Sequence, residues 1–160
     1  MEASQSGRTE TMKALLERGA DIHEKDNRGI TALMYASQNG HIDTVKALIK
    51  NGANINEKNK QGWTALMYAS LDGHIEIVRV LLRNGAGARI NQKNKCGSWT
   101  ALMYACRHGH IAVVDALLEK GASIKLINND NETALHIAQR NGYNNIVRLL
   151  ESPPKTKSTM

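Results

Sequence analysis

The phrase "GWTALMYAS", Gly62 to Ser70, occurs four times with small changes in this 160-residue chain. The other copies are "GITALMYAS" from Gly29, "GSWTALMYAC" from Gly97 and "NETALHIAQ" from Asn131. The threonines that head the copies stand at positions 31, 64, 100 and 133, so their spacings are 33, 36 and 33 residues. A period near 33 residues predicts a stack of similar units, in which each unit buries its apolar side against its neighbours.

Each unit is predicted to form two short antiparallel helices followed by a polar turn. Thr64 can cap the first helix through its side-chain oxygen, and Gly73 ends that helix where a positive φ favours glycine. Apolar residues at helical spacing, such as Ile75, Val78 and Leu81, mark the second helix. The segment "NINEKNKQG" has the Asn and Gly of a tight turn. The sequence therefore predicts an all-α solenoid of helix-turn-helix units with β-turn fingers.

The combined pattern resembles the ankyrin repeat family over residues 1–151. The matching features are the Gly-x-Thr-x-Leu opening, Gly-His at 73–74, Val-x-x-Leu-Leu, Gly-Ala-x-Ile-Asn and the period. The family usually has Thr-Pro-Leu-His, whereas all four copies here have Ala in place of Pro, and the His survives only as His136. The expected organisation is a partial first unit at 1–25, units at about 26–58, 59–93, 94–127 and 128–151, and a disordered tail at 152–160.

Composition and charge narrow the class of protein. The net charge is +6, which is typical of a solvated surface and also permits acidic partners or nucleic acid. No run of 18 apolar residues exists, so no membrane span is predicted, and the polar N-terminus does not resemble a signal peptide. Cys96 and Cys106 fit no zinc pattern. We expect free thiols and an intracellular protein, cytoplasmic or nuclear.

No catalytic motif is found in the sequence. It has no P-loop, no nucleophile elbow, no HExxH and no dinucleotide fingerprint. His41, His74 and His110 repeat in register, which predicts a structural role between layers rather than catalysis. His108 and His110 lack further nearby ligands, so we predict no metal site, no cofactor and no enzyme activity.

The resemblance implies a binding face on the concave side, made by the turn tips and the first helices. Residues that vary from copy to copy on this side are the candidates for partner contact. Trp63 and Trp99 form an apolar middle, and Lys58, Lys93 and other cations surround it, as expected of a binding hot spot. The full predicted contact set is Trp63, Trp99, Arg107, Lys60, Lys95, Arg28, Ile30, Leu71, Asp72 and His108.

The leading hypothesis is a monomeric scaffold or adaptor that binds a protein or peptide with acidic and apolar residues. Two other hypotheses use the same residues. Bases could stack on the Trp rings while Lys binds phosphates, giving a nucleic acid or phosphorylated-ligand binder. The resemblance also implies a third hypothesis, because some ankyrin domains read methylated lysine with aromatics at these registers and an acid. The counterparts here are Trp63, Tyr68 and Tyr104, with Asp72 nearby, and aromatic faces attract a methylated ammonium by cation–π interaction. The Trp rings could also be packing residues that lie over the turn of the next layer.

Overall fold

A computed structural model describes residues 1–152, and within that range the regular elements are helices and one isolated β-bridge between Lys25 and Thr31. The helices are α1 (Glu2–Gln5), α2 (Thr9–Glu17), α3 (Ala32–Gln38), α4 (Ile42–Lys50), α5 (Ala65–Leu71), α6 (Ile75–Arg83), the 3₁₀ helix η1 (Ala86–Arg89), α7 (Ala101–His108), α8 (Ile111–Glu119), α9 (Ala134–Arg140) and α10 (Asn144–Glu151). Of the predicted tail at 152–160, only Ser152 lies within the described residues.

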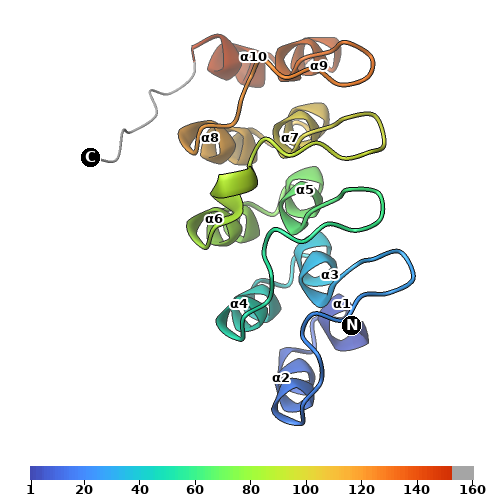
Figure 1. Ribbon diagram of the computed structural model, residues 1–160. Coiled ribbons are helices and arrows are strands. Elements are labelled where there is room, and N and C mark those ends of the chain that lie inside the picture. The colour runs from blue at the N-terminus through green and yellow to red at the C-terminus, as the bar shows by residue number, and fades with distance from the viewer. Residues whose placement is uncertain (153–160) are drawn as a thin grey trace.

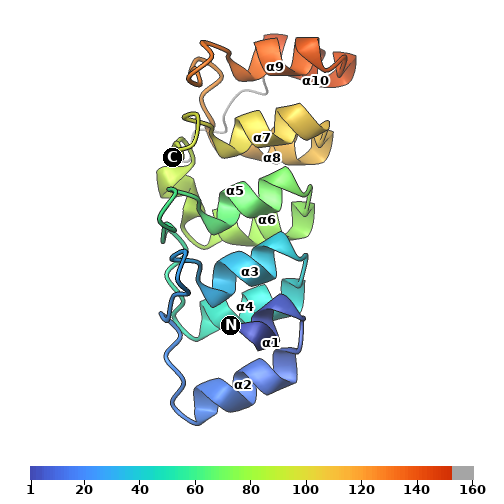
Figure 2. The same ribbon diagram turned by 90° about the vertical axis from the view of Figure 1, so that its right-hand side faces the viewer.

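The helices form a ladder of antiparallel pairs (Figure 1). Helices α1, α3, α5, α7 and α9 make an inner row beside the projecting turns, and α2, α4, α6, α8 and α10 make an outer row. Seen after a quarter turn, the pairs lie as successive rungs with the turns along one edge (Figure 2). The predicted all-α solenoid with turn fingers is confirmed.

The threonine that opens each copy caps an inner helix. Thr64 Oγ1 accepts a hydrogen bond from the backbone N–H of Met67, 3.3 Å away, and Thr31 and Thr100 do the same in their units. Only the fourth copy adds the return bond, in which His136 Nδ1 accepts from the backbone N–H of Thr133 at 3.2 Å. A methionine side chain offers no such acceptor, so Ala-x-Met copies depend on the threonine oxygen alone.

Histidines tie each layer to the one before it. His74 Nε2 lies 2.9 Å from the carbonyl oxygen of Gln38, and His110 Nε2 lies 2.9 Å from that of Leu71. His41 bonds the carbonyl of Gln5 in the same way. Each of these carbonyls lies in the last turn of an inner helix, where the backbone carbonyls have no N–H partner within the helix. The predicted structural role of the three histidines is confirmed.

Gly40 and Gly73 each lie against the histidine ring of the following layer, where a side chain would not fit. Gly73 has φ +74°, and a Cβ added to it would lie 2.6 Å from the ring of His110. Gly73→Ala is therefore expected to lower the free energy of unfolding by about 2 kcal/mol or more, because it combines left-handed strain with a displaced, hydrogen-bonded ring. Chemical denaturation measures the loss.

Gly52→Ala is the matched control for that substitution. Gly52 has φ +88°, and an added Cβ would meet nothing within 4 Å. It should therefore show only the backbone strain, about 1 kcal/mol. Equal losses for the two variants would show that the histidine contact is not what requires glycine at 73.

The core is continuous through the stack. Inner helices meet through small residues, since Ala36, Ala69 and Ala105 are fully buried and allow the helices to approach closely. At one shared register each outer helix from α4 to α10 places a leucine in the core, at Leu48, Leu81, Leu117 and Leu150. Leu15 holds the same register in α2, the first outer helix, but is 46% exposed.

The longer spacing between the second and third copies appears as a separate element. The other units run from Gly-Ala directly to the turn, but here Ala86–Arg89 forms η1, which packs on α6. Ala86 and Ile90 are buried and anchor the insertion at both ends. The remaining extra residue is Ser98, which adopts φ +59° in the finger before Trp99.

Candidate functional site

One Asn or Asp organises each finger. Asn59 Oδ1 accepts hydrogen bonds from the backbone N–H groups of Gln61 and Trp63, at 3.0 and 2.9 Å. The equivalent residues in the other fingers are Asp26, Asn94 and Asn128, each of which accepts from finger N–H groups. The side-chain oxygen thus supplies the acceptor that a neighbouring strand would otherwise offer to these N–H groups. It fixes the position of the residue before each Thr.

The same side chain holds a tyrosine of the following inner helix. Asn94 Nδ2 donates to the Tyr104 hydroxyl at 2.8 Å, and Asn59 Nδ2 donates to that of Tyr68 at 3.1 Å. In the first finger the Tyr35 hydroxyl donates to Asp26 Oδ2 at 2.8 Å. Burial raises the pKa of Tyr104 to about 12. These pairs were not predicted, although an Asn or Asp stands before each Thr and the fourth copy has Ile137 instead of Tyr.

Asn94→Ala is expected to cost about 1–3 kcal/mol of folding free energy. It removes partners from the buried Trp99 N–H and the buried Tyr104 hydroxyl, and an unsatisfied buried polar group costs more than a hydrogen bond gains. Asn94→Asp should recover most of the loss at neutral pH, because Asp26 already accepts from a tyrosine hydroxyl and from finger N–H groups. Equal loss in both variants, measured by chemical denaturation, would contradict this role.

Four aromatic rings from two neighbouring layers form a continuous cluster. The ring of Trp63 lies 4.9 Å from that of Tyr68 and 4.5 Å from that of Tyr104, measured between centroids. Trp99 in turn lies 5.2 Å from Tyr104. Trp63 therefore packs across the layer boundary and remains half-buried. The Trp rings therefore do take part in packing, which the sequence left open as an alternative to partner contact. Part of Trp63 still faces solvent.

Two of the predicted contact residues offer little surface. Trp99 is 7% exposed and Ile30 is 4% exposed. Trp99 lies between Tyr104 and the guanidinium of Arg107, which sits 5.3 Å from the indole ring centroid. The ring thus supports the position of Arg107 by cation–π attraction.

The cations of this side differ in their partners. Arg28 Nε lies 3.3 Å from Asp26 Oδ2, and its Nη2 donates to the Tyr35 hydroxyl. Burial alone would raise the pKa of Asp26, but hydrogen bonds from Ile30, Tyr35 and Arg28 lower it. Arg107 is exposed and forms no ion pair with any residue in the described range. Arg107 is therefore a cation available to an outside carboxylate.

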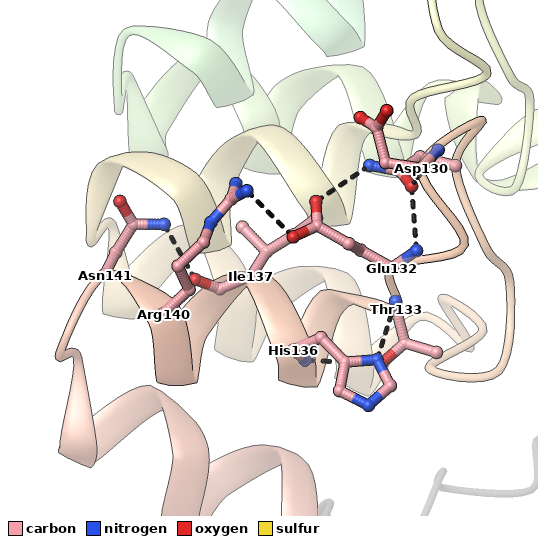
Figure 3. A network of polar contacts seen from close by, with 8 residues as sticks. Asp130, Glu132, Thr133, His136, Ile137, Arg140 and Asn141 are labelled. Carbon is pink, nitrogen blue, oxygen red and sulfur yellow. Dashed lines mark hydrogen bonds and ion pairs between the residues drawn. The ribbon is translucent and has the colours of Figure 1, made fainter.

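In the fourth unit, the position equivalent to Trp63 and Trp99 holds an acidic residue that pairs with a cation of the same unit (Figure 3). Glu132 stands where Trp63 and Trp99 stand in their units, and its carboxylate lies 2.8 Å from Arg140 Nη1. Asn128 Nδ2 also donates to Glu132, at 3.2 Å. Arg140 occupies the register of Arg107. In the fourth unit Glu132 thus neutralises Arg140. In the third unit the aromatic ring of Trp99 takes the place of the acid beside Arg107.

The finger tips present the predicted lysines. Lys60 N donates to the Arg28 carbonyl at 3.0 Å, and Lys95 N donates to the Gln61 carbonyl at 2.8 Å. These bonds join successive fingers into one row and leave the side chains of Lys60 and Lys95 exposed. The row therefore fixes the spacing between the backbone positions of Lys60 and Lys95.

The remaining predicted residues lie at the far ends of the inner helices. Leu71 ends α5 and is half-buried, and Asp72 after it is exposed. His108 is exposed, and its ring stacks on that of His110 at 6.1 Å between centroids. Burial, Arg107 and His110 together lower the pKa of His108. We call the surface made by Lys60, Trp63, Leu71, Lys95 and Arg107 the finger face.

The cysteines and the possible metal ligands lie apart from one another in the described part of the chain. Cys96 is exposed on the third finger and Cys106 is buried, both as free thiols, and burial raises the pKa of Cys106 to about 12. Within residues 1–152 no three His, Cys, Asp or Glu side chains are grouped as metal ligands would be. No helix in that range is long and apolar enough to cross a membrane.

Comparison with known proteins gives one family. The family model described as ankyrin repeats, in three copies, matches residues 1–94 and again residues 86–158. Together the two matches cover nearly the whole chain, in agreement with the repeated layers seen in the structure. No curated protein matches the chain.

Proposed function

Because this chain belongs to the ankyrin repeat family, whose members are generally protein–protein interaction modules, we propose that it is a scaffold or adaptor that binds a partner on the finger face. The partner is a protein or peptide with acidic and apolar residues. The observation that supports this most is Arg107, an exposed guanidinium held over Trp99 without an ion-pair partner among residues 1–152.

The apolar part of the proposed contact is Trp63 with Leu71. Both are half-buried, and both lie in the layer next to that of Arg107. Hot spots of protein interfaces are enriched in Trp and Arg at positions where ring and guanidinium are already fixed. Trp63 is fixed by two tyrosine rings, and Arg107 by one indole ring. Little side-chain freedom would be lost on binding.

The geometry favours this partner over the two other hypotheses. A methylated ammonium needs open ring faces, but the faces of Trp63, Tyr68 and Tyr104 are packed against each other at 4.5–4.9 Å between centroids. The same contacts occupy ring surface on which a nucleic acid base would stack. The exposed lysines suit phosphates as well as carboxylates, so single-stranded RNA is a competitor in the binding experiments.

A pull-down with the native chain beside Trp63→Ala/Arg107→Glu tests the proposal. A protein retained by the native chain and lost with the double variant supports it, provided that circular dichroism shows both to be folded. Lys46→Glu/Lys50→Glu, on the outer helix α4, should retain the partner. Equal retention by the finger-face variant would overturn the assignment.

Arg107→Glu alone is expected to slow association with the captured partner, and to do so less at high salt. Long-range attraction sets the encounter rate, and salt screens it over about 8–10 Å. Stopped-flow or surface-based kinetics at two salt concentrations measure the effect. Arg79→Glu on α6 changes net charge equally and should leave the rate nearly unaltered. A loss confined to dissociation would contradict a steering role for Arg107.

A further inference from the structure

The insertion that breaks the repeat period creates a second surface, away from the finger face. The other units pass from the outer helix to the turn through Gly-Ala-x-Ile, but residues 85–90 read Gly-Ala-Gly-Ala-Arg-Ile. Gly85 adopts φ +113°, and the 3₁₀ helix η1 then runs beside α6 (Figure 1). Because Ala86 and Ile90 are buried at its ends, the insertion is anchored and Arg89 is held on its exposed side.

A wide, shallow hollow lies against this insertion. Gly87 and Ala88 line it with little side-chain bulk, and three cations line it as well. Arg89 comes from η1, Lys93 from the following turn, and Lys120 from the end of α8. Two adjacent layers of the stack therefore contribute charge to one hollow.

No carboxylate lines this hollow. Arg89 and Lys120 form no ion pair with residues of the described range, and Lys93 Nζ donates to a neutral acceptor, the carbonyl of Ile127. The adjoining hollow shares Arg89 and contains Glu57, but that carboxylate already lies 2.8 Å from Lys25 Nζ. Glu119 stands next to Lys120 and lines a neighbouring hollow with it, but none of the three cations has an ion-pair partner within residues 1–152. A surface with this excess of positive charge attracts anions.

We propose that the hollow of Arg89, Lys93 and Lys120 is a second binding site, which takes an acidic protein segment through two or more carboxylates. Asn91 and Gln92 line it as well. Asn91 Oδ1 accepts from the backbone N–H of Ser123 and Gln92 Nε2 donates to the Lys93 carbonyl, and each amide NH₂ keeps a hydrogen that can be donated to a carboxylate oxygen. No aromatic ring lines it, so it lacks the stacking platform on which single-stranded nucleic acids are bound. The site is wide and shallow, as an extended chain requires.

The test measures binding of a fluorescein-labelled octaglutamate peptide by fluorescence anisotropy, at about 10 mM and about 150 mM salt. A Gly-Ser peptide and an eight-nucleotide single-stranded DNA carry the same label. Arg89→Glu/Lys120→Glu should raise the Kd for octaglutamate about tenfold or more at low salt. The Gly-Ser peptide should not bind.

Lys46→Glu/Lys50→Glu is the matched control, because it changes the net charge by the same amount on an outer-helix surface without the hollow. It should shift the Kd less than about twofold, and all variants should keep the native melting temperature within a few degrees. Arg107→Glu shows whether octaglutamate binds the finger face instead: a rise in Kd larger than that caused by Arg89→Glu/Lys120→Glu would overturn the proposal. Equal weakening by the control, or no binding by the native chain, would overturn the proposal. So would DNA that binds more tightly than octaglutamate and is lost with Arg89→Glu/Lys120→Glu.

Discussion

Leu81→Ala is expected to lower the free energy of unfolding by about 2–5 kcal/mol. Leu81 is fully buried in the central layer, where α6 meets α4 and α8. Removing its branched end loses transfer free energy and leaves a cavity that the close-packed helices fill only in part. Since each layer is stabilised by its neighbours, the loss should spread through the stack and appear in a probe of any layer.

Leu15→Ala is the control for this loss, because Leu15 has the same register in the first outer helix but is 46% exposed. We expect a change below about 1 kcal/mol, with the gain in helix propensity offsetting part of the lost contact. Denaturant titrations of both variants, followed by circular dichroism, give the two values. A Leu81→Ala loss as small as that of Leu15→Ala would mean that the outer-helix register is wrong.

Trp63→Ala is expected to weaken binding of the finger-face partner by about 2 kcal/mol or more, a factor of about 30. The substitution removes the solvent-facing part of the ring, which the partner would contact. It also removes the ring contacts that hold the indole in position. The fold should survive, since Trp63 is half-buried and its two tyrosine contacts are each worth about 0.5–1.5 kcal/mol. Ile111→Ala removes an exposed apolar side chain from α8, away from the finger face, and should leave affinity unchanged.

The architecture could be predicted because the residues that determine it recur in nearly every copy of the repeat. Thr64 caps its helix, Gly73 allows the chain to turn, and His74 bonds the previous layer, each as the repeat pattern indicates. A residue that recurs in register must satisfy the same neighbours in each layer. Its role can therefore be inferred from the period without knowing the coordinates.

The details of the site could not be predicted in the same way, because they depend on how rings turn between layers. The sequence placed Trp63 and Trp99 together as surface anchors, yet Trp99 is 7% exposed under Arg107 while Trp63 packs on the next layer's Tyr104. The added Ser98, with φ +59°, stands directly before Trp99 and distinguishes the two fingers. Likewise the spacing of 36 residues does not tell what form the extra residues take, because folding as η1 depends on burying Ala86 and Ile90.

The central claim is that the finger face binds a protein partner through Trp63 and Arg107. The most direct test measures the Kd for the captured partner and the melting temperature together, for the native chain, Trp63→Ala and Arg107→Glu. We expect both variants to bind at least about tenfold more weakly while they melt within several degrees of the native chain. Unchanged affinity, with a large fall in the melting temperature of Trp63→Ala, would show that Trp63 serves packing alone and would contradict the binding role of this face.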